Sequence, residues 1–353
     1  MHYPFSIYRL IPALLILAMF ATACIDEVDF PIEREDPIIF VDGMIADSLT
    51  TYKIRLGYSA EIGEGNDNIL IPIIDAVVEV HDDQGNVVNF ESDGTGFYLA
   101  EMEGVPGRSY QLKARVSGGQ QIESEMQILP QAIPLGRITS EVKIEEFLNN
   151  FNNLSTRESL ILKVSSSIPS GERPYLRWRV SGQYEFREGY PGALNTKWCY
   201  APDIVDLNQL NILSSRLLGG NELRDQEILL TDYNYRFAYM YCFHVQQLRI
   251  SEQEFNYWSQ VDLLLNRSGS LFDPPPGSIK GNMYDLEDKN QPVLGFFSVA
   301  GASYKRQFVS RDSTNIYIDD RCRFRFNQPL PQPCYDCLDL TGSTTQRPDY
   351  WIP

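Results

Sequence analysis

The sequence contains little histidine and no surplus of basic residues. Only three histidines occur in 353 residues, and Asp and Glu outnumber Lys and Arg by 47 to 30, which gives a formal net charge of −17. The scarcity of histidine argues against catalysis that depends on several imidazoles. The acidic balance argues against nucleic-acid binding, which needs a basic footprint. It also argues against adsorption of the protein surface to anionic lipid.

Motifs of the common enzyme classes are also missing. The sequence has no His-Glu-x-x-His, no Gly-x-Ser-x-Gly and no glycine loop that cradles phosphate. Paired carboxylates would suit a glycosidase, but 47 acidic residues produce pairs such as Asp319-Asp320 by coincidence. The acidic loops 61–68 and 82–83 lack the ligand spacing of calcium sites and are typical of turns. We therefore expect a protein that is not an enzyme and binds no metal and no cofactor.

One apolar run near the start of the sequence indicates a targeting signal. Leu10 to Phe20 is eleven residues long, whereas a membrane-spanning helix needs about 20, so the run is typical of a signal-peptide core. The small residues before Cys24, in Phe20-Ala21-Thr22-Ala23-Cys24, resemble a bacterial lipobox. We expect a signal peptide over 1–23 and a covalent lipid on Cys24. The alternative is ordinary secretory cleavage that leaves Cys24 as a thiol.

The residues after Cys24 are acidic. Ile25-Asp26-Glu27-Val28-Asp29 resembles the surface-export signal of Bacteroidota lipoproteins, and the alternative is a solvated tether without signal content. We expect residues 24–36 to form an acidic tether and the protein to be anchored in the outer membrane by lipid, facing the cell exterior.

Short alternating segments fill residues 37–130. In Thr51 to Leu56, for example, Tyr52, Ile54 and Leu56 share one face, and turn signals such as Asp82-Asp83-Gln84-Gly85 separate the segments. Seven such strands predict an immunoglobulin-like or prealbumin-like β-sandwich. The fold alone does not decide whether this domain is a spacer or a binding module.

Residues 131–353 predict a larger β-rich domain with one clear α-helix. Strands are expected at 159–165, 175–186, 234–250, 293–299 and 304–309, with a bulge at Gly182 and either a short helix or a loop at 141–151. The helix begins with Ser251 as N-cap and Glu254 at N3, which fits a capping box. The fold class is thus mainly β: a sandwich domain, then a β-rich domain with an irregular tail.

Five cysteines remain after Cys24. Disulfides are expected outside the cytoplasm, and five cysteines allow two bridges and one thiol. We expect two bridges among Cys199, Cys322, Cys334 and Cys337, with the pairing open, and Cys242 buried as a small apolar residue. One alternative is a Cys199–Cys242 bridge. The other is a zinc site on Cys322, Cys334 and Cys337 with a fourth ligand such as His244, but the spacing of these residues does not match that of common zinc sites.

Aromatic residues provide the candidate contact surface. Tyr190, Trp198 and Tyr200 are a possible ligand platform, since sugars stack on flat rings, but packing under a disulfide-bonded loop is the favoured interpretation. Phe272 begins a stiff proline loop that is either a docking edge or a rigid crossover.

The order of several segments resembles a known family. The segments are Phe40 to Ile45, Gly94 to Tyr98, Ile250-Ser251 through Trp258, Leu271 to Pro274, Gly281 to Met283, Leu294 to Phe297, Cys334 to Cys337 and Arg347 to Trp351. In this order they resemble a family of Bacteroidota lipoproteins known as domain of unknown function 4249. Cys242 departs from the family pattern.

The resemblance implies an outer-membrane lipoprotein and no catalytic residues. It implies an accessory to a TonB-dependent transporter in nutrient uptake, with the barrel as partner. The alternative is a surface lipoprotein that binds a ligand or glycan, or adheres, on its own. Both interpretations are non-enzymatic and exclude nucleic acid as a partner.

Overall fold

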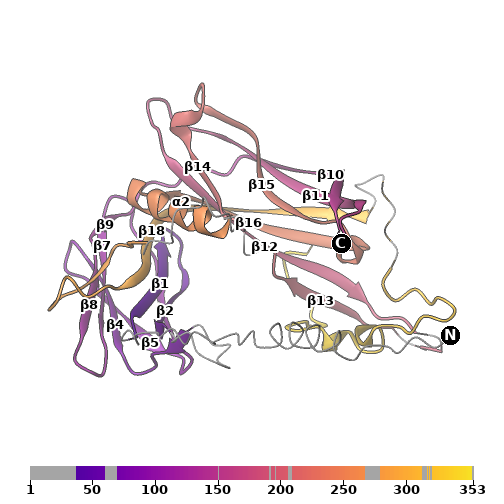
Figure 1. The fold of residues 1–353 in the computed structure, drawn as a ribbon, viewed down its shortest axis with the longest axis horizontal. Coiled ribbons are helices and arrows are strands. Elements are labelled where there is room, and N and C mark those ends of the chain that lie inside the picture. The colour runs from indigo at the N-terminus through magenta and orange to yellow at the C-terminus, as the bar shows by residue number, and fades with distance from the viewer. Residues whose placement is uncertain are drawn as a thin grey trace, which may run out of the picture. The chain divides into compact units, whose positions relative to one another are not determined.

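A computed structural model describes residues 37–59, 70–149, 151–190, 192–194, 196–205, 209–266, 279–311, 316, 318 and 320–351. The chain divides after Asp36, and the unit Pro37–Pro353 is the one described below. Cys24 and Phe272 lie outside the described residues, as do the expected signal peptide and acidic tether. The described residues form a mainly β structure with one α-helix, which confirms the expected fold class (Figure 1).

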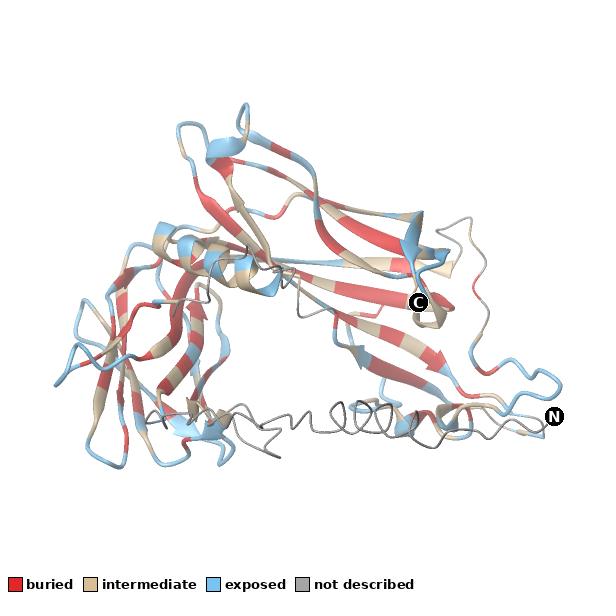
Figure 2. Cartoon of the chain, in the orientation of Figure 1, coloured by how far each residue is buried: buried red, intermediate tan, exposed pale blue. Residues whose placement is uncertain are grey.

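Two layers of strands enclose the first core. The strands are β1 (Ile39–Ala46), β2 (Thr50–Ser59), β3 (Leu70–Pro72), β4 (Val77–Asp82), β5 (Val87–Ser92), β6 (Phe97–Met102), β7 (Ser109–Arg115), β8 (Gln121–Ser124) and β9 (Gln127–Ile128). β5 hydrogen-bonds with both β6 and β4 and thereby joins the two layers. Alternate residues such as Ile54, Leu56, Val80 and Leu112 are buried between them, as expected from the period of two. Figure 2 shows this alternation of buried and exposed residues along the strands.

Strands from the end of the chain complete this sandwich. β17 (Met283–Asp285) pairs with β8, and β18 (Leu294–Ser310) runs parallel to β1. Gly295 of β18 has φ +99° and approaches β1 so closely that a Cβ would lie 1.8 Å from the Val41 carbonyl oxygen, so only glycine fits. The hydrogen-bonded sheet therefore continues across the boundary expected at residue 130.

β18 also belongs to a second group of strands. The sheet continues from β18 through β16 (Met240–Ile250) and β12 (Tyr175–Arg187) to β13 (Trp198–Asp203), and β14 (Asn211–Ser214) pairs with another part of β12. A separate three-stranded sheet contains β10 (Arg137–Leu148), β11 (Leu154–Ser167) and β15 (Glu222–Asp232). A second apolar core, which includes Leu162, Trp178, Ile228 and Phe243, lies between these two sheets.

The helix α2 (Glu252–Leu265) lies against β12 and β18 (Figure 1). Its N-terminus is as expected, because the Ser251 hydroxyl accepts a hydrogen bond from the Glu254 backbone N–H at 3.1 Å. The Glu254 side chain does not close a capping box. It is buried and bonds to other partners, which are described with the site.

The structure corrects three local expectations. Residues 141–148 are neither helix nor loop but part of β10, which pairs with β11 along its whole length. The strand expected over 234–250 is interrupted by a 3₁₀ turn (Tyr235–Phe237), because the Asn234 side chain accepts a hydrogen bond from the Arg236 N–H and caps that turn. Gly182 forms no bulge: its register with β16 is regular, and it makes room for the Tyr241 ring.

Two disulfides hold the irregular tail. Cys199 pairs with Cys337 and Cys322 with Cys334, so the four cysteines expected to form bridges do so, with partners that the sequence left open. Cys242 is free and buried. The remaining short turns are 3₁₀ segments at Ser215–Leu217, Gln332–Cys334 and Cys337–Asp339.

Candidate functional site

A cavity of about 1450 Å³ opens on one face of the continuous sheet, and we refer to it as the cleft. Side chains from β1, β2, β12, β16 and β18 contribute most of its wall. Residues that face one another in register point to the same side of a sheet, so the register predicts which side chains share this face. Two rows cross three strands, Arg179–Gln246–Tyr304 and Ser181–His244–Arg306.

Exposed cations are a notable feature of the cleft. Lys53 and Arg55 come from β2, Arg179 from β12 and Arg306 from β18, and all four side chains are exposed. None of the four has an ion pair with an acidic side chain among the described residues. By contrast, cations elsewhere such as Lys163 and Arg249 have carboxylate partners. The cleft therefore carries cations without ion-pair partners, although Asp42 also lines it, in a protein of net charge −17.

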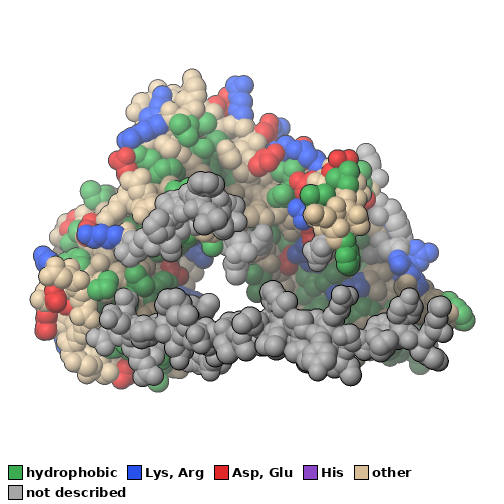
Figure 3. Space-filling view, in the orientation of Figure 1, with side chains coloured by type: hydrophobic (Ala, Val, Ile, Leu, Met, Phe, Trp, Pro, Cys, Tyr) green, Lys and Arg blue, Asp and Glu red, His purple; other side chains and the backbone are tan. Residues whose placement is uncertain are grey.

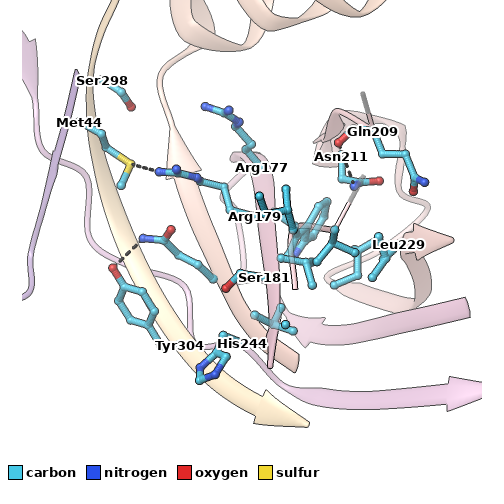
Figure 4. A pocket seen from close by; sticks show the side chains of 18 of the residues that line it. Met44, Arg177, Arg179, Ser181, Gln209, Asn211, Leu229, His244, Ser298 and Tyr304 are labelled. Carbon is cyan, nitrogen blue, oxygen red and sulfur yellow. Dashed lines mark hydrogen bonds between the residues drawn. The ribbon is translucent and has the colours of Figure 1, made fainter. Parts of the chain in front are cut away.

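Neutral polar groups lie between these cations. The Gln246 Nε2 donates to the Tyr304 hydroxyl at 2.6 Å, and the Arg179 Nη1 lies 4.0 Å from the Met44 sulfur (Figure 4). Burial lowers the pKa of His244, and the positive charge of Arg306 lowers it further. His244 therefore adds a neutral ring at pH 7 rather than a further charge.

The wall formed by α2 contains a buried charge pair. The Glu254 carboxylate accepts hydrogen bonds from the Ser298 hydroxyl at 2.7 Å and the Trp258 indole N–H at 3.1 Å, and it lies 3.7 Å from the Arg177 guanidinium. Burial raises the pKa of Glu254, against the opposing effect of Arg177. Burial likewise lowers the pKa of Arg177 to about 10. This pair attaches the helix to β12 and β18, so it supports the wall.

The C-terminal segment covers the same sheet face at its other end. Trp351 is buried with Tyr200 and Cys242, and its indole N–H donates to Glu185 at 2.7 Å. The Arg306 guanidinium lies over the Tyr350 ring, 4.1 Å from its centroid. Among the described residues, α2 and the segment Tyr350–Trp351 thus leave the cationic part of the face uncovered between them.

The cleft continues past the edge of β12. β13 ends at Asp203 and β14 begins at Asn211, so Arg179 to Ser181 have no described strand partner on that edge. We call the sheet face that carries the two rows of polar residues the first side of the cleft, and the region past this edge of β12 the second side. Figure 4 shows Gln209, Asn211 and Leu229 on the second side, while Arg177, Arg179 and Met44 lie on the first side. The second side also includes Val180, Val205 and Ile228 and is more apolar than the first.

The predicted contact aromatics do not form one platform. Tyr200 is buried beneath Trp351, with ring centroids 5.1 Å apart, and so is not available as a contact residue in this arrangement. Tyr190 packs on Tyr335 at 5.4 Å, and Trp198 packs edge-on against Tyr239 at 4.8 Å. Tyr190 and Trp198 remain partly exposed, at 38% and 40%, and both stay predicted contact residues.

The described residues, both in the cleft and elsewhere, contain no group of three or more His, Cys, Asp or Glu side chains that could hold a metal ion. The described part of the chain also has no helix long and apolar enough to cross a membrane. On the face shown in Figure 3, acidic and basic side chains are interspersed with apolar ones.

The comparison with protein families decides the family question. The family described as "Domain of unknown function (DUF4249)" matches residues 25–306. The chain belongs to the DUF4249 family. The matched range includes β1 to β17, α2 and most of β18. It also includes all four cations that we assign to the cleft, with Arg306 at its last position. No curated protein matches the chain, so DUF4249 membership identifies its relatives but supplies no activity.

Sequence reasoning missed the cations of the cleft. A signal was present, because Lys53 and Arg55 alternate with the apolar residues Tyr52, Ile54 and Leu56, and Arg177 and Arg179 alternate with Leu176 and Trp178. The alternation shows that these cations point away from the core. It does not show that β2, β12 and β18 belong to one sheet, which is what brings Lys53, Arg179 and Arg306 to one face.

Proposed function

We propose that this protein is a non-enzymatic lipoprotein, anchored in the outer membrane through Cys24 and facing the exterior. In this proposal it binds a ligand in the cleft on behalf of a TonB-dependent transporter. The lipobox-like sequence before Cys24 supports the anchor, and the acidic residues that follow it support surface display.

The observation that carries the proposal is the cleft. Small-molecule pockets usually enclose about 300–1,000 Å³, so a cavity of about 1450 Å³ suits a larger ligand. Its first side offers guanidinium, ammonium, hydroxyl and amide groups, which recognise a ligand without requiring covalent chemistry.

Exposed apolar side chains on the hairpin of β10 and β11 support the proposal of a protein partner. Several large apolar side chains near its tip are exposed: Ile144 at 68%, Leu148 at 63%, Phe151 at 84% and Leu154 at 68%. Apolar groups gathered at one exposed place are typical of an interaction site. In the proposal this hairpin contacts the transporter, while the cleft holds the ligand.

The test is purification of the tagged protein from its own membranes in mild detergent, followed by mass spectrometry. We expect a TonB-dependent barrel in stoichiometric amount. A variant with Phe151→Ser and Leu154→Ser should lose the barrel yet keep its lipid. Cys24→Ser should release the protein from the membrane, which tests the anchor separately.

A second candidate function is a ligand- or glycan-binding or adhesive lipoprotein that acts alone. The same cleft favours it, because ligand binding there does not depend on a barrel. Recovery of the lipidated protein without any barrel would exclude the accessory role and leave this second function.

A further inference from the structure

We infer that the cleft binds an acidic polysaccharide, a chain of hydroxylated rings that carries carboxylate or sulfate groups. The inference rests on the proposed function only in taking the cleft as a ligand site. It depends on the charges and the neutral groups of the first side and on the volume of the cleft.

The cations of the cleft have no ion-pair partners. Lys53, Arg55, Arg179 and Arg306 have no carboxylate within ion-pair distance among the described residues, although the chain contains 47 acidic residues. Asp42 stands opposite Arg55 in the register of β1 and β2, and it too forms no ion pair with Arg55. Cations that line one cleft without ion-pair partners repel one another, and an anionic ligand relieves that repulsion.

The cleft is also larger than a single small anion needs. Its cations come from three strands, with Lys53 and Arg55 on β2, Arg179 on β12 and Arg306 on β18. Its volume of about 1450 Å³ exceeds the roughly 300–1,000 Å³ of usual small-molecule pockets. Several linked sugar residues would fill such a cleft, whereas a single small anion would not.

Neutral polar groups lie between the charges of the cleft. Ser181, Gln246 and Tyr304 present hydroxyl and amide groups at intervals across the same face. Such groups exchange hydrogen bonds with sugar hydroxyls, and they match a ligand whose charges are separated by neutral polar atoms.

A peptide is the competing ligand class, and the strand edges argue against it. An extended peptide is usually recognised when it adds to a long exposed strand edge. The edge that β12 offers to the cleft spans only Arg179 to Ser181 among the described residues. Three residues give too few backbone hydrogen bonds to hold a strand.

The experiment measures binding of fluorescent polygalacturonate, dextran sulfate, neutral dextran and poly-L-glutamate to the mature full chain. We expect the protein to bind polygalacturonate or dextran sulfate, and to bind neither neutral dextran nor poly-L-glutamate comparably. The two acidic probes distinguish carboxylate from sulfate as the recognised group. Equal binding of neutral dextran, or tighter binding of poly-L-glutamate, would overturn the inference.

Matched variants locate the site. The triple variant Lys53→Gln, Arg179→Gln and Arg306→Gln should weaken binding at least about tenfold, since it removes several charge-assisted hydrogen bonds. The control Arg137→Gln, Lys143→Gln and Arg224→Gln removes the same charge from exposed residues of the three-stranded sheet. The control should bind as the wild type does, and equal weakening in both variants would contradict a site in the cleft.

The polysaccharide-binding result and the barrel co-purification result test the two proposals independently. If the triple variant still co-purifies with a barrel, the accessory role stands whatever the polysaccharide result. If the wild type binds no acidic probe but does co-purify with the barrel, the inference fails and the proposed function survives.

Discussion

Arg177 lies over the indole of Trp258, with its guanidinium carbon 3.7 Å from the ring centroid. The two residues come from β12 and α2, so this cation–π contact joins the helix to the sheet. Glu254, one turn before Trp258, completes the arrangement by accepting the indole N–H and facing Arg177. The wall of the cleft therefore depends on a buried charge pair.

The first prediction concerns Glu254. Removing one partner of a buried pair leaves the other charge uncompensated, so Glu254→Ala should lower the free energy of unfolding by about 3–5 kcal/mol. Glu254→Gln can keep hydrogen bonds to Ser298 and Trp258 and should cost less. Urea denaturation of the three proteins measures both values. Equal losses in the two variants would mean that the hydrogen bonds kept by Gln contribute nothing, and a negligible loss in Glu254→Ala would contradict the buried pair.

The same residue gives a pH dependence of known sign. The folded pKa of Glu254 is raised above 4.5, so the folded protein binds this proton more tightly than the unfolded chain does. The contribution is fully present below about pH 4.5 and is lost as pH rises through the raised pKa. The stability of the wild type relative to Glu254→Gln should therefore fall with rising pH, and a rise would contradict the assignment.

The second prediction concerns Gly182. A Cβ at this position would lie 1.9 Å from the Tyr241 hydroxyl oxygen, which itself donates to Asp203 at 2.6 Å. Gly182→Ala must displace the buried Tyr241 ring and should destabilise the protein by about 1–3 kcal/mol. Gly220→Ala is the control, because nothing lies within 4 Å of its Cβ position. Thermal unfolding should show a clear loss for the first variant and a near-neutral effect for the second.

The third prediction ranks the two disulfides. Cys199–Cys337 joins residues 138 apart, and Cys322–Cys334 joins residues 12 apart. Loop-closure entropy makes the longer loop more stabilising by about 2 kcal/mol in the chain-entropy account. The double variant Cys199→Ser and Cys337→Ser should thus unfold at lower urea than Cys322→Ser with Cys334→Ser. The reverse order would mean that local contacts, not chain entropy, dominate.

The fourth prediction concerns the free thiol. Burial raises the pKa of Cys242 to about 11, so at pH 8 little thiolate is present and reagents have no access. Under native conditions a maleimide should leave Cys242 unlabelled, and denaturation should make it reactive. Peptide mass spectrometry identifies the labelled residue, and rapid native labelling of Cys242 would exclude the buried position.

Local chemistry in the sequence was sufficient for much of the fold. Period-two alternation predicted strands such as 51–56, and the Ser251 cap predicted the start of α2, because each depends on neighbouring residues. Local patterns gave wrong predictions at two positions. The Asn234 side chain caps a turn inside an apolar alternating run, and Gly182 is needed because the Tyr241 ring of another strand lies against it. Those features depend on contacts that local patterns do not contain.

The site was less predictable than the fold. The cleft depends on the parallel pairing of β18 with β1, which joins residues about 250 positions apart. Without that pairing, Lys53 and Arg306 are two surface cations with no relation to each other. The aromatics chosen as contacts, such as Tyr200, alternate in the same way whether they are exposed or, as here, buried beneath a later segment.

The most direct test of the cleft is a gain of affinity. Asp42 is the acid that stands on the cationic face beside Lys53 and Arg55, and it opposes an anionic ligand there. Fluorescence titration of polygalacturonate and dextran sulfate against the wild type and Asp42→Asn measures its effect. We predict tighter binding by Asp42→Asn, about two- to fivefold at low salt, with the difference shrinking as salt screens the charges. Unchanged or weaker binding by Asp42→Asn would contradict an anion site in the cleft.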